Sequence, residues 1–164
     1  MKIAIRALIL LLIVLWLGGI MFFPIVAATA FSSLPDAHAA GTIVGQCLRV
    51  LHEEGLFCGT VIVLLLLTAQ FIRAVPRSVA APVVLTLIML ALTAFSQFSI
   101  MPRMEHDRIA VGGAIDAVPP GNPNRMDFNK LHRRSEKVEE GVLLAGIALV
   151  ILVAANYPKL EKLA

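Results

Sequence analysis

The sequence predicts an all-α polytopic membrane protein, a four-transmembrane-helix bundle with an amphipathic helix before the second span. Apolar residues make up 59% of the 164 residues and charged residues 15%, whereas soluble domains average about 45–50% and about 25%. A soluble domain of this size could not bury so much apolar surface. In addition, four apolar segments approach the roughly 20 helical residues that cross a bilayer.

The four segments form a single membrane domain over residues 1–164. Each is predicted to be a helix, because a backbone in lipid must satisfy its own hydrogen bonds. Residues 102–137 are expected to form an extramembrane loop. The first segment has no charged residue, and it is too long for a cleaved secretory signal, although Ala37-His38-Ala39 resembles a cleavage site. The predicted spans are residues 7–31, 56–72, 79–101 and 138–155.

Several local features refine these spans. Pro24 predicts a kink in the first span, and Pro102 and Pro158 are expected to close the third and fourth. Residues 41–55 show the periodicity of an amphipathic helix, which either lies on the membrane surface or extends the second span. Asn124 is a candidate N-cap for a helix that continues into the fourth span.

Small and polar residues inside the spans predict helix packing. Thr86, Thr93 and Gln97 are spaced by seven and four residues, so they share one face of the third span. Such residues usually hydrogen-bond to neighbouring helices in lipid, and a binding site is the alternative. Small residues let helices approach closely, and the predicted packing set also includes Gly18, Gly19, Gly141 and Ala145.

The positive charges favour one topology. Four spans place both termini on one side of the membrane, and Lys/Arg in short loops favour the cytoplasmic side. The last loop is also rich in Lys/Arg, which favours the opposite topology, but it balances them with Asp and Glu. The expectation is a multi-pass protein of the cell (inner) membrane with both termini cytoplasmic. The positive residues on the terminal side are Lys2, Arg6, Arg73, Arg77, Lys159 and Lys162.

The sequence shows no pattern typical of an enzyme. It has no nucleophile elbow, no H-E-x-x-H and no pair of carboxylates inside a span. It also has no dense basic stripe with aromatic residues, which argues against nucleic-acid binding. The two cysteines, Cys47 and Cys58, would lie about 16 Å apart on one helix and could not pair. The chain is therefore expected not to be an enzyme, and the sequence identifies no cofactor.

One group of residues suggests a metal or proton site. His52 and His132 each precede a span on the side of the membrane shared by the first and third loops, and Glu139 lies further along the last helix. Imidazole and carboxylate groups are ligands for several divalent metals, and an ionisable residue near a membrane indicates function. The alternative is that Glu139 belongs to a solvated helix end.

Four short motifs resemble the transmembrane protein 205-like family, a domain of unknown function. They are LWLGGIMFFP (Leu15 to Pro24), SLP (Ser33 to Pro35), MPR (Met101 to Arg103) and FNKLHRRS (Phe128 to Ser135). The stretch CLRVLH departs from the family's pattern at the start of the second span, where the family has Phe-Pro and an aromatic residue. The resemblance implies a bacterial four-helix membrane protein. Eukaryotic members are linked to platinum-drug resistance, which suggests that the family handles metals or small molecules.

Two functional hypotheses follow. The first is a non-enzymatic membrane protein that handles metal ions or small molecules in the bilayer. The second is an accessory subunit of a larger membrane complex, which would supply packing or hold a lipid or pigment. The expected partners are the lipid bilayer and either other membrane subunits or further copies of the chain.

Overall fold

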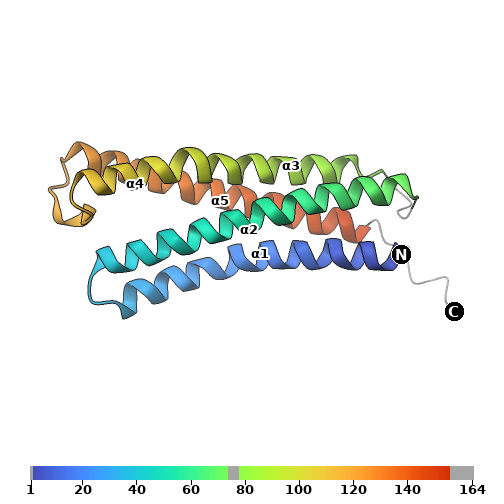
Figure 1. Cartoon of the computed structure of the whole chain (residues 1–164), viewed down its shortest axis with the longest axis horizontal. Coiled ribbons are helices and arrows are strands. Elements are labelled where there is room, and N and C mark those ends of the chain that lie inside the picture. The colour runs from blue at the N-terminus through green and yellow to red at the C-terminus, as the bar shows by residue number, and fades with distance from the viewer. Residues whose placement is uncertain (1, 74–77, 156–164) are drawn as a thin grey trace.

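The computed structural model describes residues 2–73 and 78–155, which fold as an elongated bundle of helices (Figure 1). No strand occurs in this part of the chain. Four continuous helical stretches are long and apolar enough to cross a membrane, so the prediction of a four-helix membrane bundle is confirmed. The helices are α1 (Lys2–Ser33), α2 (Ala37–Phe71), α3 (Ala80–Phe95), the π-helical turn η1 (Ser96–Ile100), α4 (Met101–Ala110), the short 3₁₀ turn η2 (Ile115–Ala117) and α5 (Pro123–Ala155).

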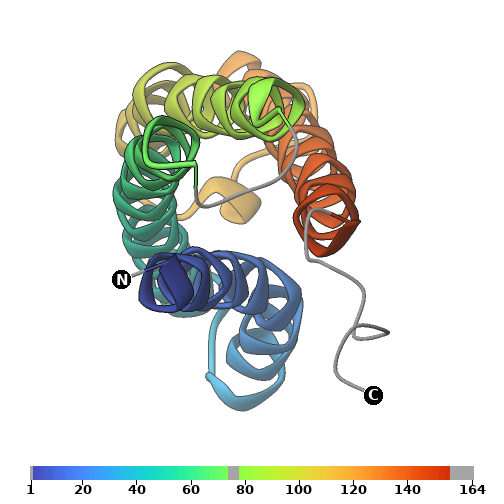
Figure 2. The same ribbon diagram turned by 90° about the vertical axis from the view of Figure 1, so that its right-hand side faces the viewer.

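The four stretches lie side by side in the order α1, α2, α3, α5. Figure 2 shows them as an arc, with α1 and α5 at its two ends. Neighbours along the chain make the extensive contacts, and α1 touches α5 over a smaller area. The connections at residues 34–36 and 111–122 lie at one end of the bundle, and the end of α2 and the start of α3 lie at the other (Figure 1).

The second span and the amphipathic segment form one helix. α2 begins after Asp36, whose Oδ1 accepts a hydrogen bond of 2.7 Å from the backbone N–H of Ala39. It then runs for 35 residues, about 50 Å at 1.5 Å per residue. Because a bilayer core is only about 30 Å thick, α2 is long enough to project well beyond it. Of the two arrangements expected for residues 41–55, the structure shows the extension of the span.

The helix of the third span does not end at Pro102, contrary to expectation. Helix continues from α3 through η1 and α4 to Ala110, and Pro102 occupies the first turn of α4. In the π turn before it, the N–H of Met101 donates to the carbonyl of Ser96, five residues back. The π turn directly precedes Pro102. Because proline has no N–H and its ring crowds the preceding turn, a wider turn at this point lets the helix continue. The predicted loop of residues 102–137 is therefore reduced to residues 111–122, with η2 inside it.

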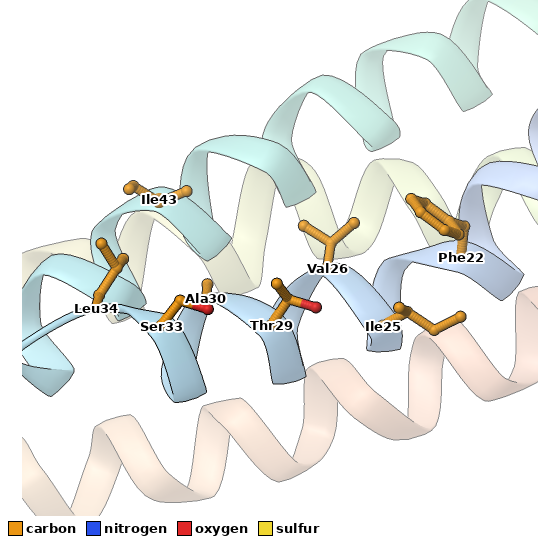
Figure 3. Close-up of a pocket in the computed structure, with 8 residues that line it drawn as sticks. All are labelled: Phe22, Ile25, Val26, Thr29, Ala30, Ser33, Leu34 and Ile43. Carbon is orange, nitrogen blue, oxygen red and sulfur yellow. The ribbon is translucent and has the colours of Figure 1, made fainter.

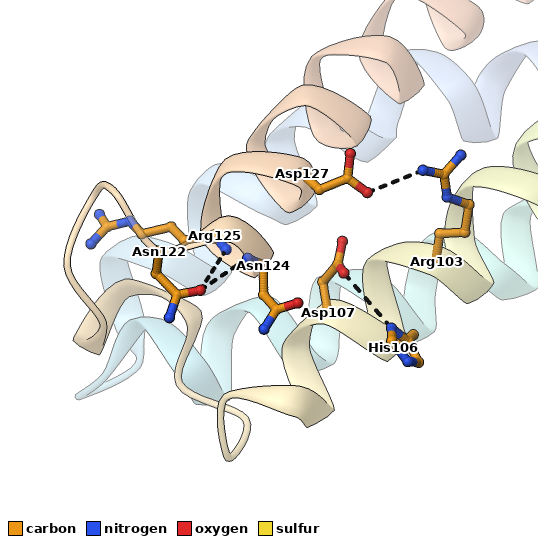
Figure 4. A network of polar contacts seen from close by, with 7 residues as sticks. All are labelled: Arg103, His106, Asp107, Asn122, Asn124, Arg125 and Asp127. Atoms are coloured by element: carbon orange, nitrogen blue, oxygen red, sulfur yellow. Dashed lines mark hydrogen bonds and ion pairs between the residues drawn. The ribbon is translucent and has the colours of Figure 1, made fainter.

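The last helix starts at Pro123, and its cap is Asn122 rather than the predicted Asn124. The Asn122 Oδ1 accepts hydrogen bonds from the backbone N–H groups of Asn124 and Arg125, at 2.9 and 3.4 Å (Figure 4). Proline is favoured at the first helical position because its φ is already helical and the N–H it lacks would have no partner. Pro158, which was expected to close the last span, lies outside the described residues.

The core of the bundle contains an apolar junction, defined as Trp16 and Leu17 of α1, Gly55 and Gly59 of α2, and Gly146 of α5. Trp16 is almost fully buried. A Cβ added at Gly55 or Gly59 would overlap its indole ring, and one added at Gly146 would overlap the side chain of Leu17. These glycines therefore let α1 approach both α2 and α5 more closely than any larger residue would.

The predicted packing glycines show mixed outcomes. A Cβ at Gly19 would lie 2.6 Å from Leu51 Cδ1, and one at Gly141 would lie 3.5 Å from Leu92 Cδ1. Ala145 is half-buried and packs against the core. Gly18 is exposed, with no atom within 4 Å of an added Cβ, so the packing role predicted for Gly18 does not hold within the described chain.

Candidate functional site

Three polar side chains from three helical elements meet inside the bundle. We call them the polar junction: His52 of α2, Gln97 of η1 and Glu139 of α5. The His52 Nδ1 lies 3.0 Å from Gln97 Oε1, and the His52 Nε2 lies 2.7 Å from Glu139 Oε1. The His52 side chain is 1% exposed and that of Glu139 is 17% exposed. Both ring nitrogens of a buried histidine are thus in use, while the carboxyl group retains some access to the surroundings.

The helices place these residues through their buried faces. Thr86 and Thr93 are buried on the inner face of α3, and η1 continues that face to Gln97. On α5, Ser135 and Val142 are buried on either side of Glu139 along the chain. Of the packing residues predicted for the third span, Thr86 and Thr93 line the bundle interior and Gln97 hydrogen-bonds to α2.

The hydrogen-bond geometry limits where protons can lie in the polar junction. With Gln97 Oε1 as the acceptor, the His52 Nδ1 carries a hydrogen and donates it. The Nε2 atom and Glu139 Oε1 then share one proton across 2.7 Å. The pair is either an imidazolium beside a carboxylate or an imidazole beside a carboxylic acid. These two states differ only by movement of that proton along one hydrogen bond.

The polar junction lies where the charged part of the bundle meets the uncharged part. Residues 55–71 of α2, 80–95 of α3 and 141–155 of α5 contain no charged residue, and the charges of α2, α4 and α5 begin at Glu54, Arg103 and Glu140. Only the uncharged segments suit the hydrocarbon core of a bilayer. The His52 and Glu139 pair therefore occupies the rim of the membrane-embedded part, on the side of the first and third loops.

His132 is not part of this arrangement. It is 57% exposed, its ring stacks on Phe128, and its Nε2 lies 3.5 Å from Glu136 Oε1 of the same helix. Two helical turns separate it from Glu139 along the same helix. The predicted ligand set of His52, His132 and Glu139 is therefore corrected to the pair His52 and Glu139. No group of three potential metal ligands occurs among the described residues.

A groove of about 510 Å³ opens beside the polar junction, between α2 and the η1–α4 segment. Gln97 lies in its wall together with Arg49, Glu105 and His106. Glu105 forms an ion pair of 2.8 Å with Arg108. Gln97 thus contacts His52 and also lines a surface groove whose wall contains both charged and apolar side chains.

Sequence reasoning missed the contact between His52 and Gln97. It placed Gln97 on a polar face of the third span and His52 near the boundary of the second, but the two residues are 45 positions apart. The available clue was an amide and an imidazole at the same end of adjacent antiparallel spans. Gly55, Gly59 and Gly146 were missed as well, because spacing alone does not show which glycine faces a large side chain.

Taken together, the four apolar helices and the polar junction define a multi-pass membrane protein with ionisable residues at the rim of its embedded part. The family described as "Domain of unknown function (DUF4149)" matches residues 11–108. This match covers more than half of the chain, so the protein belongs to that family. Comparison with curated proteins and with solved structures found no match. The comparisons do not link the chain to the transmembrane protein 205-like family.

Proposed function

We propose that the protein handles a small cation at the polar junction and that this cation is the proton. The observation that carries the proposal is the enclosure of His52 between Gln97 and Glu139, at 3.0 and 2.7 Å. Histidine changes charge near neutral pH, and ionisable residues that are kept in membrane helices commonly serve proton or ion movement. The protein would act without covalent chemistry, as a membrane protein and not an enzyme.

The contacts favour a proton over a metal ion. Both ring nitrogens of His52 are engaged in hydrogen bonds, so a metal would have to displace Gln97 or Glu139. Zinc commonly takes four ligands in a structural site and three protein ligands in a catalytic one. A proton needs only the two atoms that already face each other.

The protonation of the two His52 ring nitrogens in the full chain tests the proposal. We expect ¹⁵N NMR of histidine-labelled protein in lipid nanodiscs to show a hydrogen on Nδ1 and, at Nε2, the signal of a nitrogen that shares a proton with a carboxyl group. Glu139→Gln should change the Nε2 signal, because a neutral amide cannot accept the shared proton. His132→Ala should leave the Nε2 signal unchanged. An Nε2 signal without a shared proton, or one that Glu139→Gln does not affect, contradicts the proposal.

The alternative that the polar junction holds a metal ion is tested by elemental analysis of the purified protein. If the protein contains stoichiometric metal that is lost in His52→Ala and kept in His132→Ala, the cation at the polar junction is a metal ion and not a proton. Without such metal, the proton remains the better candidate.

A second candidate function, an accessory subunit of a larger complex, is favoured by an apolar groove on α1. The groove has a volume of about 340 Å³, and Figure 3 shows aliphatic and aromatic side chains around it. A helix of another subunit would fit such a surface. The native mass of the protein purified in mild detergent tests this candidate. A mass that includes other subunits favours an accessory role, whereas the mass of the chain alone contradicts it. The lining residues are Phe22, Ile25, Val26, Thr29, Ala30, Ser33, Leu34 and Ile43.

We further propose that the protein resides in the inner membrane of a bacterium with both termini in the cytoplasm. The support is the positive charge near the termini, including Lys2 and Arg6. This orientation would turn the polar junction and the loops at residues 34–36 and 111–122 to the outer side. Reporter fusions to the N-terminus and to residues 111–122 test this orientation. Activity of a reporter that works only in the cytoplasm, when it is fused to residues 111–122, would show the opposite orientation.

A further inference from the structure

Two buried hydroxyl groups lie next to the polar junction without a partner. The side chains of Thr93 and Ser96 are 1% and 0% exposed, and neither hydroxyl oxygen has a hydrogen-bond partner among the described residues. Leaving a buried hydroxyl unbonded is costly, and in proteins such groups are usually satisfied by another group or by an internal water molecule. These two residues therefore need a partner that the helices themselves do not supply.

Other threonines, in α2 and α3, behave differently. The hydroxyl of Thr60 donates to the carbonyl of Leu56, that of Thr68 to Leu64, and that of Thr86 to Pro82, at 2.7 to 2.8 Å. Each of these carbonyls lies four residues back, the usual acceptor for a hydroxyl in a membrane helix. Thr93 and Ser96 depart from this pattern where α3 changes into the π turn η1. π turns inside helices frequently mark functional sites.

The two hydroxyls lie between a polar and an apolar part of the bundle. Towards the loops, Gln97 follows Ser96 in the chain and contacts His52. Towards the middle of the bilayer, one turn from Thr93 on the same buried face, Met89 packs with its Cε 3.2 Å from the position of a Cβ at Gly146. The apolar junction follows directly, so the polar character stops there.

We infer that Thr93 and Ser96 hold internal water between the polar junction and Met89. A hydroxyl both donates and accepts, and buried waters typically make about three hydrogen bonds to polar groups. The function of this water rests on the proposed proton handling: it would give the proton shared by His52 and Glu139 an exchange partner on the membrane side. Met89 and the apolar junction lie beyond these hydroxyls towards the middle of the bilayer, so the proposal is an isolated water site and not a continuous channel.

Radiolytic footprinting of the full chain in nanodiscs tests this inference. Hydroxyl radicals made from bound water oxidise the side chains beside it, and methionine forms a sulfoxide that mass spectrometry detects. We expect Met89 to be oxidised although it is 1% exposed. The exposed Met126 provides a positive reference, and Trp16, equally buried but in the apolar junction, provides the background.

Variants of the two hydroxyls identify what holds the water. In Thr93→Val with Ser96→Ala, oxidation of Met89 should fall several-fold below its level in the wild-type protein. Thr86→Val is the matched control, because that buried hydroxyl already bonds to its own helix, and it should leave Met89 oxidation unchanged. Thr93→Ser with Ser96→Thr keeps both hydroxyls and should preserve oxidation of Met89. Circular dichroism melting verifies that each variant is folded.

The outcomes separate this inference from the proposed function. An unoxidised Met89 in the wild-type protein, or equal oxidation in the Val/Ala double variant, overturns the internal water. Neither result depends on whether His52 shares a proton with Glu139. Conversely, a His52 Nε2 signal without a shared proton, together with water-dependent oxidation of Met89, would overturn the proton proposal and leave the internal water standing.

Discussion

The polar junction and the apolar junction lie next to each other in the bundle but join helices by opposite means. At the apolar junction, the buried side chains of Trp16 and Leu17 fit over glycines, and no polar contact is needed. At the polar junction, His52 and Glu139 meet through a hydrogen bond of 2.7 Å, and Glu139 remains 17% exposed. The first depends on shape and the second on proton positions.

This difference indicates which of the two junctions contributes more to the stability of the bundle. Lipid is as apolar as the helices, so close van der Waals packing at small residues is a main source of helix association in membranes. Hydrogen bonds between membrane helices contribute less on average, because separated helices find other partners. We therefore expect the apolar junction to determine stability and the polar junction to determine the response to protons.

The largest expected effect comes from filling the apolar junction. Gly146→Leu would force a side chain into the space of Leu17 and Met89, and overpacking of this kind costs about 1–3 kcal/mol. Unfolding by SDS in detergent micelles measures the loss of stability. Trp16 is the single tryptophan and lies in the junction, so its fluorescence reports directly on the separation of α1 from its neighbours.

The matched control for this substitution is Gly141→Leu on the same helix. A Cβ at Gly141 would only reach ordinary contact with Leu92, at 3.5 Å, so the added side chain has room to turn outward. Both substitutions change helix propensity equally. Equal losses of stability in the two variants would show that the close approach at Gly146 does not stabilise the bundle.

An intermediate effect is expected at the polar junction. Glu139→Leu removes the partner of His52 Nε2, and we expect a loss of about 1 kcal/mol, within the range measured for hydrogen bonds between membrane helices. The same SDS titration measures it. Glu140→Leu, the same change at an exposed neighbouring position, should stay within about 0.5 kcal/mol of the wild type. A loss larger than that of Gly146→Leu would reverse the roles assigned to the two junctions.

The sequence predicted the parts of the fold that composition controls. Four apolar stretches sufficed for the four-helix bundle, because lipid imposes helix on each of them. The same reasoning failed at Pro102, where a π turn lets the helix continue to Ala110. A local rule for proline cannot anticipate a change of hydrogen-bond register that precedes it.

The candidate site was predicted only in part, for a geometric reason. His52 and Glu139 were both selected, and the structure brings them to 2.7 Å. His132 was added because it precedes the same span, yet its side chain is 57% exposed. It lies on nearly the same face of α5 as Glu139, seven residues on, but about 10 Å away along the helix axis. Membership in the site therefore depends on the level of each residue along the bundle, which is set by how far neighbouring helices are shifted along one another and which periodicity does not reveal.

The smallest expected effect comes from the charged end of the bundle, beyond both junctions. Arg103 and Asp127 form an ion pair of 3.1 Å between α4 and α5 (Figure 4), but their side chains are 63% and 39% exposed. Exposed pairs contribute about 0–1 kcal/mol, because water screens them and ordering two side chains is unfavourable. A double-mutant cycle of Arg103→Ala and Asp127→Ala, followed by SDS unfolding at low and high salt, measures the coupling. A coupling energy above the loss of stability measured for Glu139→Leu would mean that α4 and α5 are held together mainly by surface charge. The two buried junctions would then not account for the stability of the bundle.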